Sequence, residues 1–140
     1  MNQVRKRRPF GVTLFALLVL SFAVLNLLRL TQTIQKWDLL TILLPFSPIY
    51  LLLSGLLWAG VGFPLAWGIW RGSRLAYQLS PVFLLIYSLY LWADRLLLAV
   101  YPERLDNWQF VAALNILILA WSFWVLTRPK AMIFFGEKNE

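Results

Sequence analysis

The side chains best able to do chemistry in this sequence are a few amides, hydroxyls and charges set within long apolar runs. Arg29 and Asp94 carry opposite charges, and Tyr90 shares a helical face with Asp94 because the two lie four residues apart. A charged side chain at the centre of a bilayer costs about 2.5–3.5 kcal/mol on insertion scales, so each charge should find a partner inside the protein. We predict an Arg29–Asp94 ion pair within a polar cluster of Asn26, Arg29, Ser54, Tyr90, Asp94 and Asn115.

Two roles for this polar cluster fit the sequence. It could be a clamp that only fixes the register of neighbouring helices, or it could rim an outward-facing cavity that takes a ligand or an ion. At about 1.5 Å of rise per helical residue, the cluster falls in the outer third of the expected bundle, with contributions from four helices. The residues alone leave both roles open.

Much catalytic chemistry is excluded by composition. The 140 residues include no His and no Cys, so the usual zinc sites, Ser-His-Asp and Cys-His triads and disulfides lack their ligands. The sequence also has no Gly-rich phosphate loop with Lys and no hydrolase motif. We therefore expect no catalytic residue, cofactor or metal, and no enzyme activity.

The elements that must position the polar cluster are membrane helices. Hydrophobic residues make up 61% of the chain and charged residues 14%, against about half and about a quarter in soluble domains. Apolar segments at about 9–29, 49–70, 75–94 and 109–127 each approach the ~20 residues that a helix needs to cross a bilayer. The segments do not alternate as barrel strands would. We predict an all-α membrane protein, with residues 1–140 forming one antiparallel bundle of four transmembrane helices.

The first segment also has the basic start and apolar stretch of a signal peptide. Its apolar run is too long for a typical signal core, so we expect it to be kept as a membrane anchor.

The distribution of basic residues predicts that both termini are cytoplasmic. Most of the 13 basic residues fall on the side of the two termini and of the short turn at 71–74. The opposite side balances its basic residues with acids. The basic start at residues 5–8 is interpreted as contact with anionic lipid headgroups, and no nucleic-acid partner is expected.

The two external connections are unusually apolar. We interpret 30–47 as an extension of the first helix or as a helix at the outer interface that ends at Pro45 and Pro48. The segment at about 95–107 is interpreted as interfacial in the same way.

Small residues follow one another along the second segment at four-residue spacing, which lets helix backbones approach closely. The predicted helix-packing face is Gly60, Pro64, Gly68 and Gly72, with Gly55, Ala59, Gly62 and Ala66 on neighbouring ridges. This face could pack within the bundle, form a homodimer seam, or dock another membrane-protein subunit. Pro64 should kink the helix.

Several short motifs resemble a family of small, uncharacterised four-helix bacterial inner-membrane proteins: those at 8–13, 47–50, 54–55, 127–130 and 134–137. The resemblance implies a multi-pass protein of the bacterial plasma (inner) membrane and carries no activity with it. Small multidrug transporters also have four helices, but they need a membrane-embedded Glu in the first helix, where this sequence has no acid.

The sequence thus favours a noncatalytic membrane protein: an accessory subunit, an assembly factor or a homo-oligomeric scaffold. The alternative is a small channel, transporter or lipid/quinone-binding protein that uses the outer polar cluster. An intramembrane enzyme is a third class, and it lacks an acid–base pair at depth.

Overall fold

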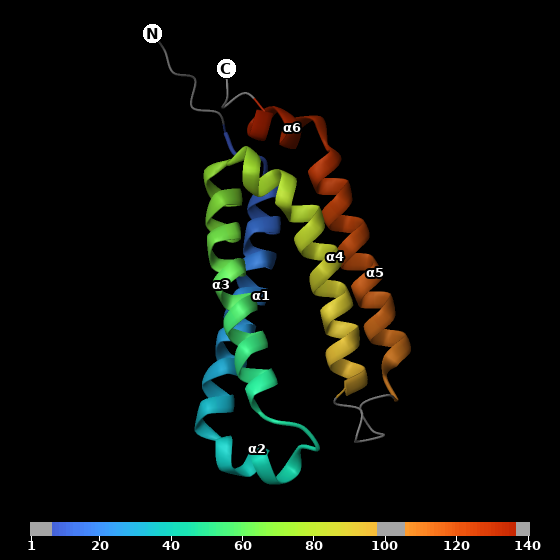
Figure 1. The fold of residues 1–140 in the computed structure, drawn as a ribbon. Coiled ribbons are helices and arrows are strands. Elements are labelled where there is room, and N and C mark those ends of the chain that lie inside the picture. The colour runs from blue at the N-terminus through green and yellow to red at the C-terminus, as the bar shows by residue number, and fades with distance from the viewer. Residues whose placement is uncertain (1–6, 98–105, 137–140) are drawn as a thin grey trace.

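The computed structural model describes residues 7–97 and 106–136, and the part that it describes is all α-helical. Four long helices run side by side, and two short ones lie across opposite ends (Figure 1). The long helices are α1 (Phe10–Gln35), α3 (Ile49–Arg71), α4 (Arg74–Leu97) and α5 (Trp108–Thr127), and the short ones are α2 (Trp37–Leu43) and α6 (Pro129–Gly136).

All four long helices have the length and apolar composition needed to cross a membrane. The prediction of four helices that could span a membrane is therefore confirmed. A helix satisfies its backbone hydrogen bonds within itself, which is why such sequences fold this way in lipid. The helices begin within a residue or so of the predicted bounds, while α1 and α4 continue beyond them, to Gln35 and Leu97.

The connection between the first two long helices contains an extension of the first helix and a separate short helix, and its place at the outer interface stays a prediction. Helix α1 extends six residues past Arg29, to Gln35, and α2 then begins after Lys36, whose backbone leaves the helical region. In Figure 1, α2 lies across the end of the α1–α3 pair. Its Ile42 is 81% exposed. Residues 98–105 of the second predicted interfacial segment lie outside the described residues.

Helices α1 and α3 form the tightest pair in the bundle because small residues line their contact. A Cβ atom at Gly62 would stand 2.8 Å from the Cβ of Ala23, and one at Gly55 would stand 3.2 Å from the carbonyl oxygen of Asn26. Both distances are below ordinary van der Waals contact. The ridge that carries Gly55 and Gly62 therefore brings the two backbones together.

The predicted helix-packing face lies on a different side of α3 from the ridge that carries Gly55 and Gly62. Gly60 and Pro64 are exposed, and a Cβ at Gly60 would meet nothing within 4 Å. Packing inside the bundle is thus the wrong interpretation for these two residues, since the helix turns the neighbouring ridge toward α1. Gly68 does approach a neighbour, Ala76 of α4. Helix α3 continues past Pro64 as one helix.

Gly72 has a separate role, at the turn between α3 and α4. Its φ of 74° lies in the left-handed region, which a residue with a Cβ rarely adopts. The amide of Ser73 donates to the Gly68 carbonyl at 2.8 Å, which closes the end of α3. The result is the tight α3–α4 hairpin expected from the sequence.

Helix α6 was not predicted. It begins at Pro129, a residue that suits the first position of a helix because its missing N–H would have no partner there. Phe135 is buried and stacks on Tyr77 of α4 with ring centroids 4.9 Å apart. Tyr77 in turn donates a hydrogen bond to the carbonyl of Leu126, so α6 and the end of α5 are fastened to α4.

Substitutions at two glycines should separate the packed ridge from the exposed one. Gly62→Val places methyl groups against Ala23, and overpacking of this kind costs about 1–3 kcal/mol. Gly60→Val changes the helix propensity equally but meets open space. We expect a lower thermal unfolding temperature for Gly62→Val alone, measured by loss of the monodisperse peak in detergent after heating. Equal losses for the two variants would contradict the packing described.

Candidate functional site

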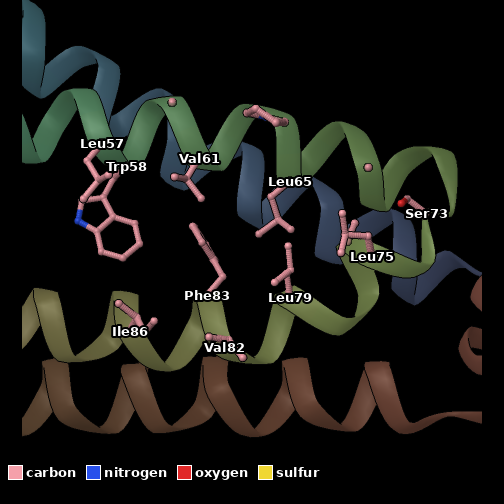
Figure 2. A pocket seen from close by; sticks show the side chains of 14 residues that line it. Leu57, Trp58, Val61, Leu65, Ser73, Leu75, Leu79, Val82, Phe83 and Ile86 are labelled. Atoms are coloured by element: carbon pink, nitrogen blue, oxygen red, sulfur yellow. The ribbon is translucent and has the colours of Figure 1, made fainter.

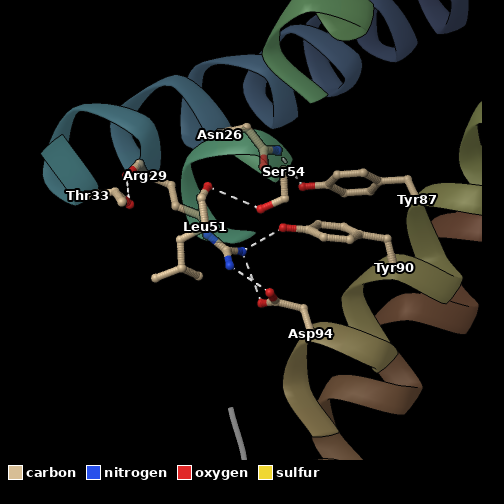
Figure 3. Close-up of polar contacts among 8 residues, drawn as sticks. All are labelled: Asn26, Arg29, Thr33, Leu51, Ser54, Tyr87, Tyr90 and Asp94. Atoms are coloured by element: carbon tan, nitrogen blue, oxygen red, sulfur yellow. Dashed lines mark hydrogen bonds and ion pairs between the residues drawn. The ribbon is translucent and has the colours of Figure 1, made fainter. Parts of the chain in front are cut away.

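The expected ion pair between Arg29 and Asp94 is present, and it joins α1 to α4 (Figure 3). Arg29 Nη2 donates to Asp94 Oδ1 at 2.6 Å, and Nη1 donates to Oδ2 at 3.0 Å. This is the bidentate arrangement in which a guanidinium and a carboxylate interact most strongly. Nη1 also donates to the hydroxyl of Tyr90 at 2.7 Å. One guanidinium therefore holds two side chains of α4.

A second contact lies one helical turn deeper in the bundle. Asn26 Nδ2 donates to the hydroxyl of Tyr87 at 2.9 Å and to the backbone carbonyl of Phe22 at 2.8 Å. Tyr87 is buried among aromatic rings, with the ring centroid of Trp58 4.8 Å away and that of Phe22 4.9 Å away. These aromatic rings therefore lie between the polar cluster and the apolar half of the bundle.

Helical spacing explains why these partners meet. Asn26 and Arg29 lie three residues apart on α1, and Tyr87, Tyr90 and Asp94 follow one another by three and four residues on α4. Each set occupies one face of its helix, so two facing stripes form a ladder of contacts. Tyr87 was not included in the predicted cluster. The same spacing would have identified it as a member.

Helix α3 adds Ser54, which is buried beside the tyrosine hydroxyls in Figure 3. Its hydroxyl donates to the carbonyl of Leu51 at 3.2 Å. Tyr50, one turn earlier, lies within electrostatic range of Asp94 and Tyr90. Tyr50 had no place in the predicted cluster, because no charge or amide on its own helix marks it.

Asn115 does not join the other five predicted residues. Its Oδ1 accepts a hydrogen bond from Ser88 at 2.9 Å, in a separate contact between α4 and α5. Ser88 lies on another face of α4 from Tyr87 and Tyr90, because one residue of helix turns the side chain by about 100°. The cluster is therefore built from α1, α3 and α4, and the expectation that all four long helices contribute to it is corrected.

The two charged side chains of this cluster are largely shielded from solvent and paired with each other. The side chain of Asp94 is 13% exposed and that of Arg29 is 25% exposed, and the carboxylate is held through both oxygens. Within residues 7–97 and 106–136, no group of three or more acids could hold a metal ion. The outward-facing cavity proposed for this cluster stays a prediction.

The exposed row of small residues on α3 borders a groove between α3 and α4, which we call the α3–α4 groove (Figure 2). Its volume is about 520 Å³, and Gly60, Pro64 and Gly68 form part of its wall. Val61, Leu79 and Phe83 extend into it in Figure 2, and Ser73 is the one polar side chain among its lining residues. Such a surface suits hydrocarbon, from lipid or from another helix.

No protein-family model matches this chain, and no curated protein or solved structure is significantly similar to it. The resemblance to small bacterial inner-membrane proteins is supported at the level of four candidate membrane-spanning helices. The function of the chain must therefore be inferred from its helices and their contacts.

Charge reversal should test whether the ion pair fastens α1 to α4. Arg29→Asp and Asp94→Arg each leave a charge beside a like charge, and an unsatisfied buried polar group costs about 1–3 kcal/mol, or more when it is charged. We expect each single variant to unfold at a lower temperature in detergent, and the double variant to recover part of the loss.

Lys36→Asp provides the matched control, since it reverses an exposed charge between α1 and α2. It should leave the unfolding temperature unchanged. If Arg29→Asp and Asp94→Arg are as harmless as the control, the pair does not hold the bundle together.

Proposed function

We propose that this chain is a noncatalytic component of a membrane assembly: an accessory subunit, an assembly factor or a homo-oligomeric scaffold. The observation that carries the proposal is that the polar groups best suited to chemistry are engaged with one another. Arg29 holds Asp94 through two hydrogen bonds and Tyr90 through a third, and Asn26 holds Tyr87. A catalytic or transport site needs groups that are available to a substrate, whereas a clamp needs groups that satisfy each other.

The shape of α5 also supports a role in assembly. It is packed along one edge, with Ser122, Val125 and Leu126 as its buried residues among those described. Large side chains project from the rest of it, including Phe110, Ile116 and Leu117, each 65% exposed or more. A helix held this way presents a long apolar face to lipid or to a neighbouring membrane helix.

We further propose that the end of the bundle carrying α6 is cytoplasmic in a bacterial plasma membrane. Arg8, Arg71, Arg74, Arg128 and Lys130 all lie at this end, next to the start of α1, the α3–α4 turn and α6. An excess of Lys and Arg favours the cytoplasmic side. The polar cluster then faces the opposite side of the membrane.

A lipid- or quinone-binding role is the second candidate, and the α3–α4 groove favours it. The groove is apolar, open to the side of the bundle and bordered by small residues that leave room for a chain. A channel or transporter would instead require the Arg29–Asp94 pair to open, because that pair occupies the polar path between α1 and α4.

Mild solubilisation from native membranes, followed by sizing and mass spectrometry, tests the proposed role. We expect either a homo-oligomer or a second membrane protein in fixed stoichiometry, since both would cover exposed apolar faces. Gly60→Leu should weaken the assembly if the partner docks on the α3–α4 groove, and the monomer has space for that side chain. A monomer that retains a small molecule and no protein would contradict the proposal and favour the second candidate.

A further inference from the structure

Two adjoining hollows open at the end of the bundle that carries α6. One lies between α1 and α5, has a volume of about 420 Å³, and is lined in part by Phe10, Leu14, Trp121 and Trp124. The other has a volume of about 390 Å³ and lies beside α6, against Ile133 and Phe134. Pro9 and Lys130 line both hollows, so the two hollows border each other. We call the pair of hollows the basic groove.

Positive charge gathers at the rim of the basic groove. Arg7 precedes α1, Arg128 follows α5, and Lys130 is in the first turn of α6, and all three line the groove. Among the residues that the structure describes, no acid lines the groove. Across the described segments, the acids lie at the opposite end of the bundle: Asp38 in α2, Asp94 in the last turns of α4, and Asp106 in the turn before α5.

The Arg128 guanidinium is held in place by an aromatic ring. Its central carbon lies 3.6 Å from the ring centroid of Trp124, so the two groups are in cation–π contact. A guanidinium that rests on a ring through its flat face keeps its N–H donors in its own plane, where they remain available to a phosphate.

The wall below this rim is hydrocarbon. Leu14 lies one helical turn beyond Phe10 along α1, or about 6 Å deeper into the bundle. On α5, Trp121 lies seven residues before Arg128, or about 10 Å deeper. Phe10 is 77% exposed and Trp124 is 53% exposed, so the apolar wall is uncovered in the monomer. The groove thus runs from cations at the interface to apolar side chains within the membrane.

We propose that the basic groove binds one anionic phospholipid, with its phosphate between Arg7, Arg128 and Lys130 and an acyl chain between α1 and α5. Basic pockets between helices on the cytoplasmic side of a membrane are suited to such headgroups. The α3–α4 groove makes an internal comparison, because no charged residue lines it and it should take acyl chains without regard to headgroup. This site goes beyond the proposed role in assembly and does not depend on it.

Trp121 provides a local reporter for the test. The full chain is reconstituted in phosphatidylcholine vesicles with increasing fractions of either brominated phosphatidylglycerol or brominated phosphatidylcholine, since bromine on an acyl chain quenches nearby indoles. The difference between each protein and its Trp121→Phe counterpart isolates quenching at the groove. We expect phosphatidylglycerol to reach half-maximal quenching at a mole fraction at least about fivefold lower than phosphatidylcholine, as one cation near the membrane surface contributes about that factor.

Variants at the same end of the bundle separate a built site from general attraction to the surface. Lys130→Gln should reduce the preference for phosphatidylglycerol about fivefold, while Lys130→Arg should keep it. Arg74→Gln removes one charge from the α3–α4 turn, outside the basic groove, and should leave the preference unchanged. Size-exclusion profiles in detergent confirm that each variant is folded.

Three results would overturn the proposal. The first is equal quenching by the two brominated lipids in the unmodified protein. The second is an equal loss of preference in Lys130→Gln and Arg74→Gln, which would indicate attraction to the whole basic surface. The third is a loss in Lys130→Arg as large as that in Lys130→Gln.

Discussion

A polar side chain within a membrane must find its partner inside the protein, and the Arg29–Asp94 pair is where this constraint shapes the bundle most. The bidentate contact links the side chains of α1 and α4 at one end, and the hydroxyl of Tyr90 and the amide of Asn26 continue the connection inward. Apolar side chains pack against lipid as favourably as against each other, so apolar packing alone does not fix the position of α4 relative to α1. Hydrogen bonds with fixed geometry determine this position.

Contacts among the other helices hold the bundle together at both ends. Helices α1 and α3 approach closely through the ridge of Gly55 and Gly62, and the Gly72 turn returns the chain directly into α4. At the same end, Tyr77 holds the last turn of α5 and stacks on Phe135 of α6. The α3–α4 groove lies between the Gly72 turn and the contact of Trp58 with Tyr87. The positions of these contacts set the position of the α3–α4 groove. Its wall is lined almost entirely by apolar groups.

The two ends of the molecule therefore differ in chemistry. At the end with α2, the opposite charges of Arg29 and Asp94 neutralise each other in the polar cluster. At the end with α6, cations stand together without acids among the lining residues of the basic groove. Satisfied polar groups favour a structural role for the first end, and unbalanced charge favours recognition of an anionic surface at the second.

The sequence by itself determined the four spanning helices, the tight turn near 71–74 and the pairing of Arg29 with Asp94, because each depends on local features. Length and apolar composition decide whether a helix can span a bilayer, and the spacing of Tyr90 and Asp94 decides which face they share. The tertiary structure decided which ridge of α3 is buried, that Asn115 pairs with Ser88 away from the cluster, and that Tyr50 approaches it. It also placed Arg7, Arg128 and Lys130 around one groove. These outcomes depend on how each helix is rotated about its axis and on which neighbour it meets, and helices that are apolar on nearly every side carry little information about either.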